Sequence, residues 1–437
     1  MRIAIVGTGV SGLVAAHALH RDHDVTIYEA DERVGGHAHT VDVEVGGVRH
    51  AVDTGFIVYN EANYPGFTAL LRELGVETQP TEMSFSVTDG ASGLEYRGSS
   101  LNTLFAQRRN LRRPSFLRLL GDIVRFNRAA RRLVADEARG QGADRLPGAA
   151  GDDATDGVGD ESIESFLRRG RYSRSFVEQF LVPFGSAIWS ADPSTFTRFP
   201  MRSYARFMHN HGLLGLPGRT QWRTISGGSR EYVERLVAPF ADRIRLGTGV
   251  HKVVGGPADR TAATVEVLTD LGPERFDRVI IAAHSDQALE MLADPSPSER
   301  EVLGAIAYQP NTATLHTDAR LLPNSHLARA SWNSWIEPGG RRATLTYWMN
   351  NLQAITSEQP ILLTLNRTDA IDPKLVLAEF EYQHPVFDLA AIRAQARRRE
   401  IQGARGIYFA GAYWGYGFHE DGVQSGLEVA RSIRDER

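Results

Sequence analysis

The chain has 437 residues, which is long for one hydrophobic core, so we expect two domains. Its composition is ordinary for a globular protein: 42% hydrophobic residues, 23% charged residues and a formal net charge of −4. This balance does not favour nucleic-acid binding, so we expect no nucleic-acid partner. The absence of cysteine excludes disulfides, thiolate metal sites and cysteine nucleophiles.

The chain shows no targeting or membrane-spanning segment. An apolar strand begins directly after Arg2, so we expect no signal peptide. No run of about 18 apolar residues occurs, so no membrane-spanning helix is predicted. We therefore expect a cytoplasmic protein.

The first 30 residues predict a β-α-β unit. Residues 2–7 are short, apolar and ended by glycine, which is typical of a buried parallel strand. Residues 11–20 follow as a helix, and residues 24–29 (D-V-T-I-Y-E) as the next strand. This order is the context in which dinucleotide-binding fingerprints occur.

The next part of the chain is mostly helical. Residues 41–53 alternate as a hairpin, and residues 64–75 have the pattern of a helix. Residues 104–139 carry arginine and leucine at helical spacing, and residues 161–183 return to a helical pattern. Between them, residues 138–160 are rich in Gly, Ala and Asp, which predicts a flexible surface insertion.

From residue 222 the pattern changes to a helix followed by strands near 244–254, 264–269 and 278–283. The motif order predicts a discontinuous dinucleotide-binding domain and a second, substrate domain. The binding domain is predicted to contain residues 1–60, 222–290 and 400–437, and the substrate domain residues 61–221 and 291–399.

The fingerprint itself is Gly7-x-Gly9-x-x-Gly12. The glycines allow a tight turn, a close approach to a pyrophosphate and packing of the helix on the sheet, while the helix N-terminus attracts phosphate. Glu29 lies twenty residues after Gly9, where a carboxylate can accept ribose hydroxyls. The pattern favours FAD or NAD over NADP.

The segment after Glu29 and Ala30 resembles the R-x-G-G-R-x-x-T motif of the flavin amine oxidase superfamily. Arg33, Gly35, Gly36 and Thr40 match this motif, and His37 stands where the family usually has arginine. A zinc pair of His37 and His39 is the alternative, but no third ligand is near, so we expect no metal site.

Further matches extend this resemblance along the chain. Asp53-Thr54-Gly55 matches a D-x-G segment, and Ser226-Gly227-Gly228-Ser229 matches the family's later G-G segment. Val250 matches a contact to adenine, and Gly411 with Gly422-Val423-Gln424-Ser425-Gly426 matches the final flavin segment. The resemblance implies an α/β fold, with a Rossmann-type FAD-binding domain and an α+β substrate domain. It implies that FAD is bound by Gly7, Gly9, Gly12, Glu29, Ala30, Arg33, Gly35, Gly36, His37, Thr54, Gly55, Val250, Gly411, Gly422, Val423 and Ser425.

Several longer segments resemble one bacterial branch of the superfamily. They include residues 54–65 (T-G-F-I-V-Y-N-E-A-N-Y-P) and the segments S-W-N-S-W, Y-W-M-N-N-L-Q, Q-H-P-V-F-D and A-G-A-Y-W-G-Y-G-F-H-E-D-G. This branch is associated with lipid methyltransferases similar to cyclopropane-fatty-acid synthase and includes a methyl-fatty-acid desaturase. The resemblance implies a fatty-acyl or phospholipid substrate, dehydrogenated by hydride transfer to flavin N5, and a lipid methyltransferase as partner.

The lysine content bears on the reaction. Flavin amine oxidases commonly hold a water near flavin N5 with a lysine, and this chain has only Lys252 and Lys374. Neither is predicted near the flavin, which argues against amine oxidation. The alternatives that stay open are a flavin amine oxidase, a fatty-acid double-bond isomerase and a non-catalytic FAD-bound partner.

Candidate catalytic residues lie before the closing helix, which we expect to start near Gly422 with its N-terminus toward the flavin. His419, Glu420 or Tyr416 would serve in proton transfer, although Glu420 and Asp421 have helix capping as an alternative role. An apolar pocket is predicted from aromatic residues, which are Trp189, Trp332, Trp335, Trp348, Tyr413, Trp414, Tyr416 and Phe418.

The Arg-rich stretch 107–132 mixes apolar and basic positions. One interpretation is contact with an anionic membrane, which would place the protein peripherally at the inner membrane face. The other is a solvated helix face whose apolar side packs inward.

Overall fold

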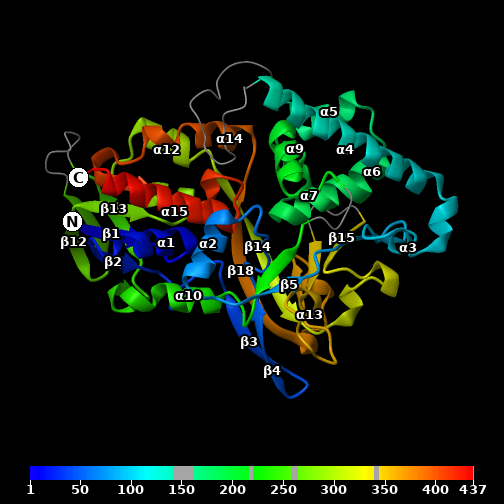
Figure 1. Cartoon of the computed structure of the whole chain (residues 1–437), viewed down its shortest axis with the longest axis horizontal. Coiled ribbons are helices and arrows are strands. Elements are labelled where there is room, and N and C mark those ends of the chain that lie inside the picture. The colour runs from blue at the N-terminus through cyan, green and yellow to red at the C-terminus, as the bar shows by residue number, and fades with distance from the viewer. Residues whose placement is uncertain (141–160, 216–219, 257–263, 339–343, 437) are drawn as a thin grey trace.

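The computed structural model describes residues 1–140, 161–215, 220–256, 264–338 and 344–436. Two sheets organise these residues, with a helical layer beside the larger sheet (Figure 1). The predicted insertion at 138–160 lies outside the described residues except for its first three positions, which end a helix. Within the described ranges, no helix has the length and apolar content needed to cross a membrane.

The first sheet explains the apolar strand at the start of the chain. Among the described residues it has five parallel strands, and β1 lies at its centre, between β2 and β13. Ile3 and Ile5 point to one buried face and Ala4 and Val6 to the other, so the four positions after Arg2 are all apolar. In sheet order the strands are β19 (Ile407–Phe409), β13 (Arg278–Ile281), β1 (Arg2–Val6), β2 (Asp24–Tyr28) and β9 (Ile244–Arg245).

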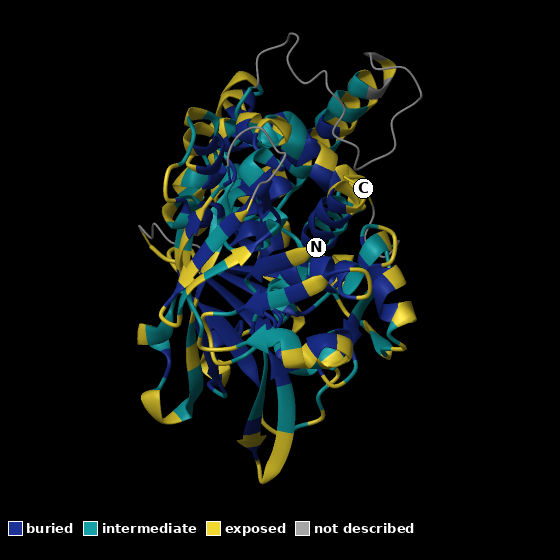
Figure 2. Cartoon of the chain, turned by 90° about the vertical axis from the view of Figure 1, so that its left-hand side faces the viewer, coloured by how far each residue is buried: buried dark blue, intermediate teal, exposed yellow. Residues whose placement is uncertain are grey.

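Both faces of this sheet are covered, which leaves its strands in the dark-blue interior of Figure 2. One face packs on α1 (Val10–Leu19), α2 (Pro65–Glu73), α10 (Arg230–Val237) and α15 (His419–Arg434). The other face packs on α11 (Ser285–Met291), α12 (Pro297–Leu303), α14 (Leu389–Ala396) and a small antiparallel sheet of β10 (Val250–Val254), β11 (Val265–Thr269) and β12 (Gly272–Phe276).

The second sheet has seven strands within the described residues. Its neighbours are antiparallel except for β15 and β6, which run parallel. In sheet order the strands are β18 (Val376–Val386), β14 (Ala307–His316), β17 (Leu362–Leu365), β16 (Thr344–Trp348), β15 (Trp332–Ile336), β6 (Phe85–Asp89) and β7 (Leu94–Arg97). Strands of the two sheets alternate along the chain, while the exact domain boundaries stay a prediction.

The predicted hairpin at 41–53 is confirmed as β3 (Thr40–Val45) and β4 (Val48–Asp53). Asp53, which is buried, accepts hydrogen bonds at Oδ1 from the Ser229 backbone N–H (2.8 Å) and the Thr40 hydroxyl (2.6 Å). Gln353 donates to its other oxygen (3.0 Å). Burial raises the pKa of Asp53 to about 6, and the bonds oppose this rise. Asp53 therefore fixes the hairpin to the start of α10.

A helical layer lies against one edge of the second sheet (Figure 1). The helix predicted in 104–139 starts later, at Pro114, and the helical stretch 161–183 is broken by a π-helical turn at Val177–Leu181. The layer contains α3 (Leu101–Leu104), α4 (Pro114–Gly140), α5 (Ile163–Arg169), α6 (Arg174–Phe176), α7 (Val182–Trp189), α8 (Pro193–Phe196) and α9 (Met201–Asn210). The remaining elements are β5 (Thr78–Thr81), β8 (Trp222–Ile225) and α13 (Met349–Leu352).

Candidate functional site

The glycine fingerprint connects β1 to α1. Gly7 has φ of 102°, and a Cβ on Gly12 would lie 2.1 Å from the Gly7 carbonyl oxygen. Both positions therefore require glycine for the turn itself. Gly9 differs, because a Cβ built there meets no atom within 4 Å. The space in front of Gly9 is open, as a ligand at the N-terminus of α1 requires.

Glu29 lies against this loop. Its carboxylate accepts a hydrogen bond from the Thr8 backbone N–H (2.8 Å), and its backbone oxygen accepts one from the Thr248 N–H (2.8 Å). The second bond brings Ala30 beside the Gly249–Val250 segment, where a Cβ built on Gly249 would lie 3.8 Å from Ala30 Cβ. The predicted nucleoside contacts thus meet from segments more than 200 residues apart.

Arg33 has an unused donor, and it lies two residues before Gly35, which contacts the same loop. Its Nη1 is buried and has no hydrogen-bond partner among the described residues. The adjoining Gly35 donates to the Thr8 carbonyl (3.1 Å), and a Cβ on Gly36 would lie 3.1 Å from Gly9 Cα. A buried cationic donor without a partner is costly unless a ligand satisfies it, and a diphosphate does so.

The Asp53-Thr54-Gly55 segment runs beside His37. A Cβ on Gly55 would lie 2.1 Å from the His37 carbonyl oxygen, so only glycine fits there. The Thr54 hydroxyl and the Tyr382 hydroxyl are 2.7 Å apart, and Tyr382 also contacts the His39 ring at 2.9 Å. Thr54 is therefore tied to β18, and its own contact with a cofactor stays a prediction.

Three histidines from distant segments meet here. The ring of His37 lies 6.1 Å from that of His284 and 5.5 Å from that of His384, measured between centroids. Burial lowers the pKa of His37 to about 3 and that of His384 to about 4, so both rings are neutral near pH 7. After burial, the neighbouring basic groups His384, His284, His419 and Arg33 lower the pKa of His37 further. No group of residues suited to hold a metal occurs in the described ranges.

The orientation of His384 is fixed by its neighbours. Asn366 donates to Asn311 Oδ1 (2.7 Å), which identifies the amide nitrogen of Asn311 as the group 2.9 Å from His384 Nδ1. Because an amide nitrogen only donates, Nδ1 accepts and the ring proton lies on Nε2. His284, Asn311 and His384 were not among the predicted site residues. Two signals were available, since His384 lies in the Q-H-P-V-F-D segment and His284 follows a predicted strand of the first sheet.

The C-terminal glycines pack α15 against α1. A Cβ on Gly422 would lie 2.6 Å from Val10 Cγ1, and one on Gly426 would lie 2.4 Å from the Ser11 carbonyl oxygen. Val423 is buried in the core, and the Ser425 hydroxyl accepts the Gly411 N–H at 3.0 Å. These residues hold the final segment beside the fingerprint, while their direct contact with a cofactor stays a prediction.

The closing helix begins at His419, so the prediction of a start near Gly422 was wrong. The Asp421 carboxylate accepts hydrogen bonds from the backbone N–H groups of Phe418 (2.9 Å) and Tyr416 (3.1 Å), which starts the helix one turn earlier. Burial raises the pKa of Asp421 to about 7. The capping role considered for Asp421 is the one that its geometry supports.

The three predicted catalytic side chains have structural partners. The His419 ring stacks on Phe56 (centroids 3.8 Å apart), and its Nε2 lies 2.7 Å from the Tyr232 hydroxyl. Burial lowers the pKa of His419 to about 3. The Tyr416 ring packs 5.5 Å from Phe207, and burial raises the pKa of this tyrosine. Catalytic roles for these residues stay predictions.

Glu420 joins α15 to α2. Its two carboxylate oxygens accept the backbone N–H groups of Gly66 and Phe67, both at 2.9 Å, at the start of α2. Gln424 also donates to it at 2.6 Å. Capping and proton transfer were both open for this residue, and the contacts favour capping.

Replacing Glu420 with alanine tests this role. We expect the free energy of unfolding to fall by about 1–2 kcal/mol, because two N–H groups lose their acceptor. Glu420→Gln retains one acceptor oxygen, so its free energy of unfolding should fall less. Urea denaturation measures the free energy of unfolding of both variants. A large loss of turnover at unchanged stability would instead assign Glu420 to proton transfer.

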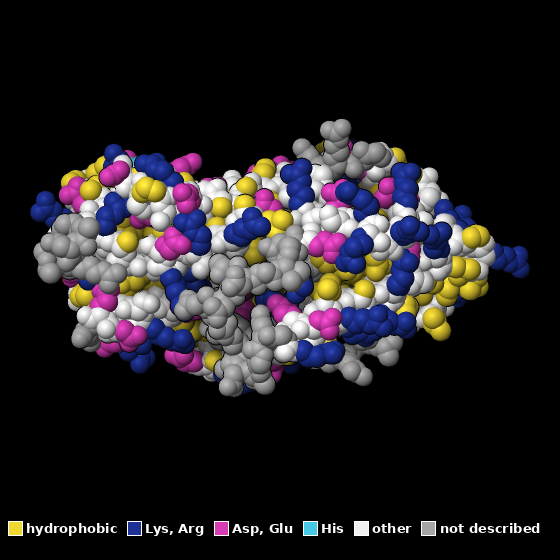
Figure 3. Space-filling model, turned by 90° about the horizontal axis from the view of Figure 1, so that it is seen from above, with side chains coloured by type: hydrophobic (Ala, Val, Ile, Leu, Met, Phe, Trp, Pro, Cys, Tyr) yellow, Lys and Arg dark blue, Asp and Glu magenta, His cyan; other side chains and the backbone are white. Residues whose placement is uncertain are grey.

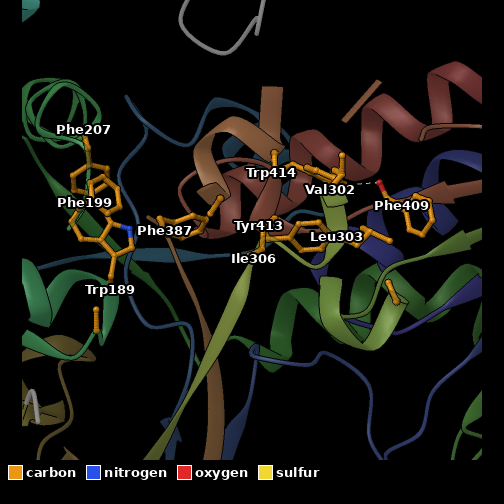
Figure 4. Packing of buried hydrophobic residues seen from close by; sticks show 14 of the residues in the cluster. Trp189, Phe199, Phe207, Val302, Leu303, Ile306, Phe387, Phe409, Tyr413 and Trp414 are labelled. Carbon is orange, nitrogen blue, oxygen red and sulfur yellow. Dashed lines mark hydrogen bonds between the residues drawn. The ribbon is translucent and has the colours of Figure 1, made fainter. Parts of the chain in front are cut away.

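The predicted aromatic pocket residues fall into separate groups rather than one pocket. Trp189 Nε1 donates to the Tyr416 carbonyl oxygen (3.1 Å), and the Trp189 ring lies 6.1 Å from that of Phe418. Tyr413 and Trp414 are only 3% and 7% exposed and pack beside Val302, Leu303 and Ile306 (Figure 4), so assigning them to a pocket was wrong. Strand alternation puts Trp335 on the opposite sheet face from Trp332. On that face the Arg367 guanidinium lies 4.0 Å from the centroid of the Trp335 ring.

A cavity of about 730 Å³ opens on the Trp335 face of the second sheet. Thr312, Arg367 and Glu379 are among its lining residues, and it includes none of the predicted cofactor residues. It is therefore separate from the site at the fingerprint.

Comparisons with known proteins agree with this geometry. A sequence profile described as "Flavin containing amine oxidoreductase" matches residues 10–434. Tryptophan 2-monooxygenase of Allorhizobium ampelinum is 35% identical over 111 residues, which are 23% of this chain and 14% of that protein. The chain thus matches about a seventh of the length of that relative.

Two solved structures share the fold. Cyclohexylamine oxidase from Brevibacterium oxydans IH-35A is 18% identical with a TM-score of 0.68, and the match covers 100% of this chain and 99% of that one. A CLA-producing fatty acid isomerase from P. acnes is 15% identical with a TM-score of 0.66, covering 99% and 98% of the two chains.

The residues at the fingerprint fit FAD. Gly9 leaves an open approach, Arg33 Nη1 offers a buried donor without a partner for a diphosphate, and Glu29 lies where a ribose would bind. The family profile covers nearly the whole chain. The chain therefore belongs to the flavin containing amine oxidoreductase family and has an amine oxidase-like fold.

Proposed function

We propose that this protein dehydrogenates a fatty-acyl chain, free or carried by a phospholipid, and so introduces a carbon–carbon double bond. FAD, when bound, supplies the acceptor for the hydride that leaves one carbon. The neighbouring carbon loses a proton, for which His419, Glu420 and Tyr416 are the predicted acceptors, and the electron pair of that C–H bond forms the double bond. The observation that carries the proposal is the chemical character of the groups around His37.

These groups are basic or neutral. The rings of His284 and His384 lie within 6.1 Å of the His37 ring, and burial lowers the pKa of all three histidines. A protonated amine that bound among these groups would lose its hydration. This desolvation is unfavourable unless a carboxylate pairs with the charge. Both lysines of the chain, Lys252 and Lys374, are exposed, so no lysine serves the site. These features favour an uncharged acyl chain over an amine.

The sheet face that carries His384 is apolar and aromatic farther along. Trp332 and Tyr347 pack edge to face (centroids 5.1 Å apart), and Phe85 packs on Phe184 of α7 in the same way at 4.9 Å. The Trp332 Nε1 is buried and has no hydrogen-bond partner among the described residues. An apolar, aromatic sheet face of this kind suits a hydrocarbon chain and excludes water.

His384 completes the proposed site as a neutral hydrogen-bond donor. Asn311 holds its Nδ1, so its Nε2–H is presented away from Asn311. A preorganised donor in a dry site stabilises negative charge that develops during reaction. Asn311 acts through His384 and is a positioning residue.

Product analysis tests the proposal. The FAD-loaded protein is incubated with methyl-branched phospholipids, and the acyl chains are analysed by mass spectrometry. We expect products that lack two hydrogens relative to the substrate. Products of unchanged mass with a moved double bond would instead establish an isomerase, and unchanged lipid together with oxidised amines would refute the lipid substrate.

A further inference from the structure

We propose that the surface formed by α3, residues 105–113 and the first half of α4 docks on an anionic lipid bilayer. The first observation is the charge of this segment. Between Gly98 and Gly121 the chain has no aspartate or glutamate, although its overall formal charge is −4. The same segment contains five arginines, which are Arg108, Arg109, Arg112, Arg113 and Arg118.

The second observation is that arginines of this surface lack acidic partners. Arg112 and Arg118 are exposed, and neither has a carboxylate within ion-pair distance in the described part of the chain. Arg108 and Arg109 donate to carbonyl oxygens of Phe105 and Gly93, which orders them without neutralising them. The positive charge of the surface is thus available to an external anion.

The third observation is apolar exposure among these arginines. Leu101 is 76% exposed, Leu111 53%, Leu117 47% and Val124 58%. Leu117 and Val124 are seven residues apart on α4 and lie on its outer side, while Phe116 and Phe126 are buried on its inner side. The outer side of α4 therefore has apolar positions where a solvated helix would have polar ones.

Figure 3 views the molecule from above, and arginine and apolar side chains gather at its right-hand end. This is the end where Figure 1 shows α3. Basic and apolar side chains thus share this end of the molecule, as docking on a membrane surface requires.

The combination of unpaired arginines and exposed aliphatic side chains favours a bilayer over a protein partner. The exposed apolar residues are separate aliphatic side chains, whereas the centre of a protein interface is usually a continuous patch rich in aromatic residues. Guanidinium groups pair well with lipid phosphates, and leucines enter the acyl boundary between them. This combination is typical of interfacial helices that lie on anionic membranes.

Vesicle sedimentation of the full FAD-loaded chain tests the proposal. We expect binding to vesicles that contain phosphatidylglycerol and little binding to phosphatidylcholine alone, with a loss of binding at high salt. Arg112→Ser combined with Arg118→Ser should weaken binding at least about tenfold, since each basic residue near an anionic surface contributes. Leu101→Gln combined with Leu111→Gln should weaken it as well.

Matched controls distinguish binding through this surface from non-specific binding to vesicles. Leu271 is 76% exposed, as Leu101 is, but lies at the β11–β12 turn. Leu271→Gln combined with Arg275→Ser should leave vesicle binding unchanged. Equal loss in this control, or no binding to anionic vesicles, would overturn the proposal. The proposal would also be overturned if the Arg112→Ser and Arg118→Ser variant bound vesicles normally but lost self-association or a complex with a methyltransferase. That result would identify the surface as a protein interface.

The docking surface and the chemistry of the FAD site are tested separately. Sedimentation needs no turnover, so a failed lipid substrate leaves the docking result intact. A protein that docks normally and yet leaves acyl chains unchanged would refute only the proposed reaction.

Discussion

Replacing Gly9 with aspartate is expected to give a folded protein that does not bind FAD. The structure leaves the space around Gly9 open, so the new side chain meets no protein atom at its Cβ. It does place a carboxylate where a pyrophosphate should lie. At about 4 Å, in a partly buried site, two negative charges repel by about 4 kcal/mol, which is close to a thousandfold in affinity. Flavin absorbance and fluorescence titration measure this loss.

The controls for this prediction come from other glycines. Gly98→Asp adds the same charge at another position with no atom within 4 Å, and it should retain FAD. Gly12→Ala forces a Cβ against the Gly7 carbonyl, so this variant should lose folding and FAD together. Normal FAD content in a folded Gly9→Asp protein would show that the cofactor does not lie at the fingerprint.

Replacing His384 with phenylalanine is expected to slow reduction of the bound flavin by about 100-fold, which is the usual cost of removing a preorganised donor. FAD binding should persist, because the ring volume is retained. Asn311→Leu should act in the same direction with a smaller effect, since it frees the ring without removing it. Anaerobic stopped-flow absorbance measures the rate.

A second readout separates this role from simple packing. The proposed site has His384 donating beside the flavin, so its loss should make the flavin reduction potential more negative, and Asn311→Leu should shift this potential in the same direction. His316→Phe is the matched control, because His316 is also a buried histidine of the second sheet, and burial lowers its pKa to about 4. Strand alternation puts it on the face opposite Asn311. Potentials that stay unchanged in both site variants would remove His384 from the mechanism.

Local patterns predicted the fingerprint well. The β-α-β unit depends on contiguous residues, since an apolar strand, three glycines and an acidic residue occur within 30 positions. The structure confirms strand Arg2–Val6 and helix Val10–Leu19, with Glu29 at the loop. Such units can be predicted because steric demands at Gly7 and Gly12 arise from their immediate neighbours.

Contacts between distant segments could not be predicted. His384 reaches His37 only because β18 pairs with β14, and Asn311 reaches His384 through the same register. A single sequence contains no signal for this register. The parallel pairing of β6 with β15 joins residues almost 250 positions apart and was missed for the same reason.

The aromatic segment at 413–418 shows a different failure. Its position beside the flavin motif suggested pocket residues, but Tyr413 and Trp414 turn into the core between α12 and β19. Composition does not distinguish an aromatic core residue from a pocket residue. The start of α15 was misplaced because the capping carboxylate of Asp421 lies inside the helix, three residues beyond Phe418.

The most direct measurement of the central claim is anaerobic bleaching of the flavin. The yellow FAD-loaded protein is mixed, without oxygen, with methyl-branched phospholipids and separately with amines, and its visible absorbance is followed. The account predicts that the lipids bleach the flavin and that the amines do not. Bleaching by amines alone would contradict it.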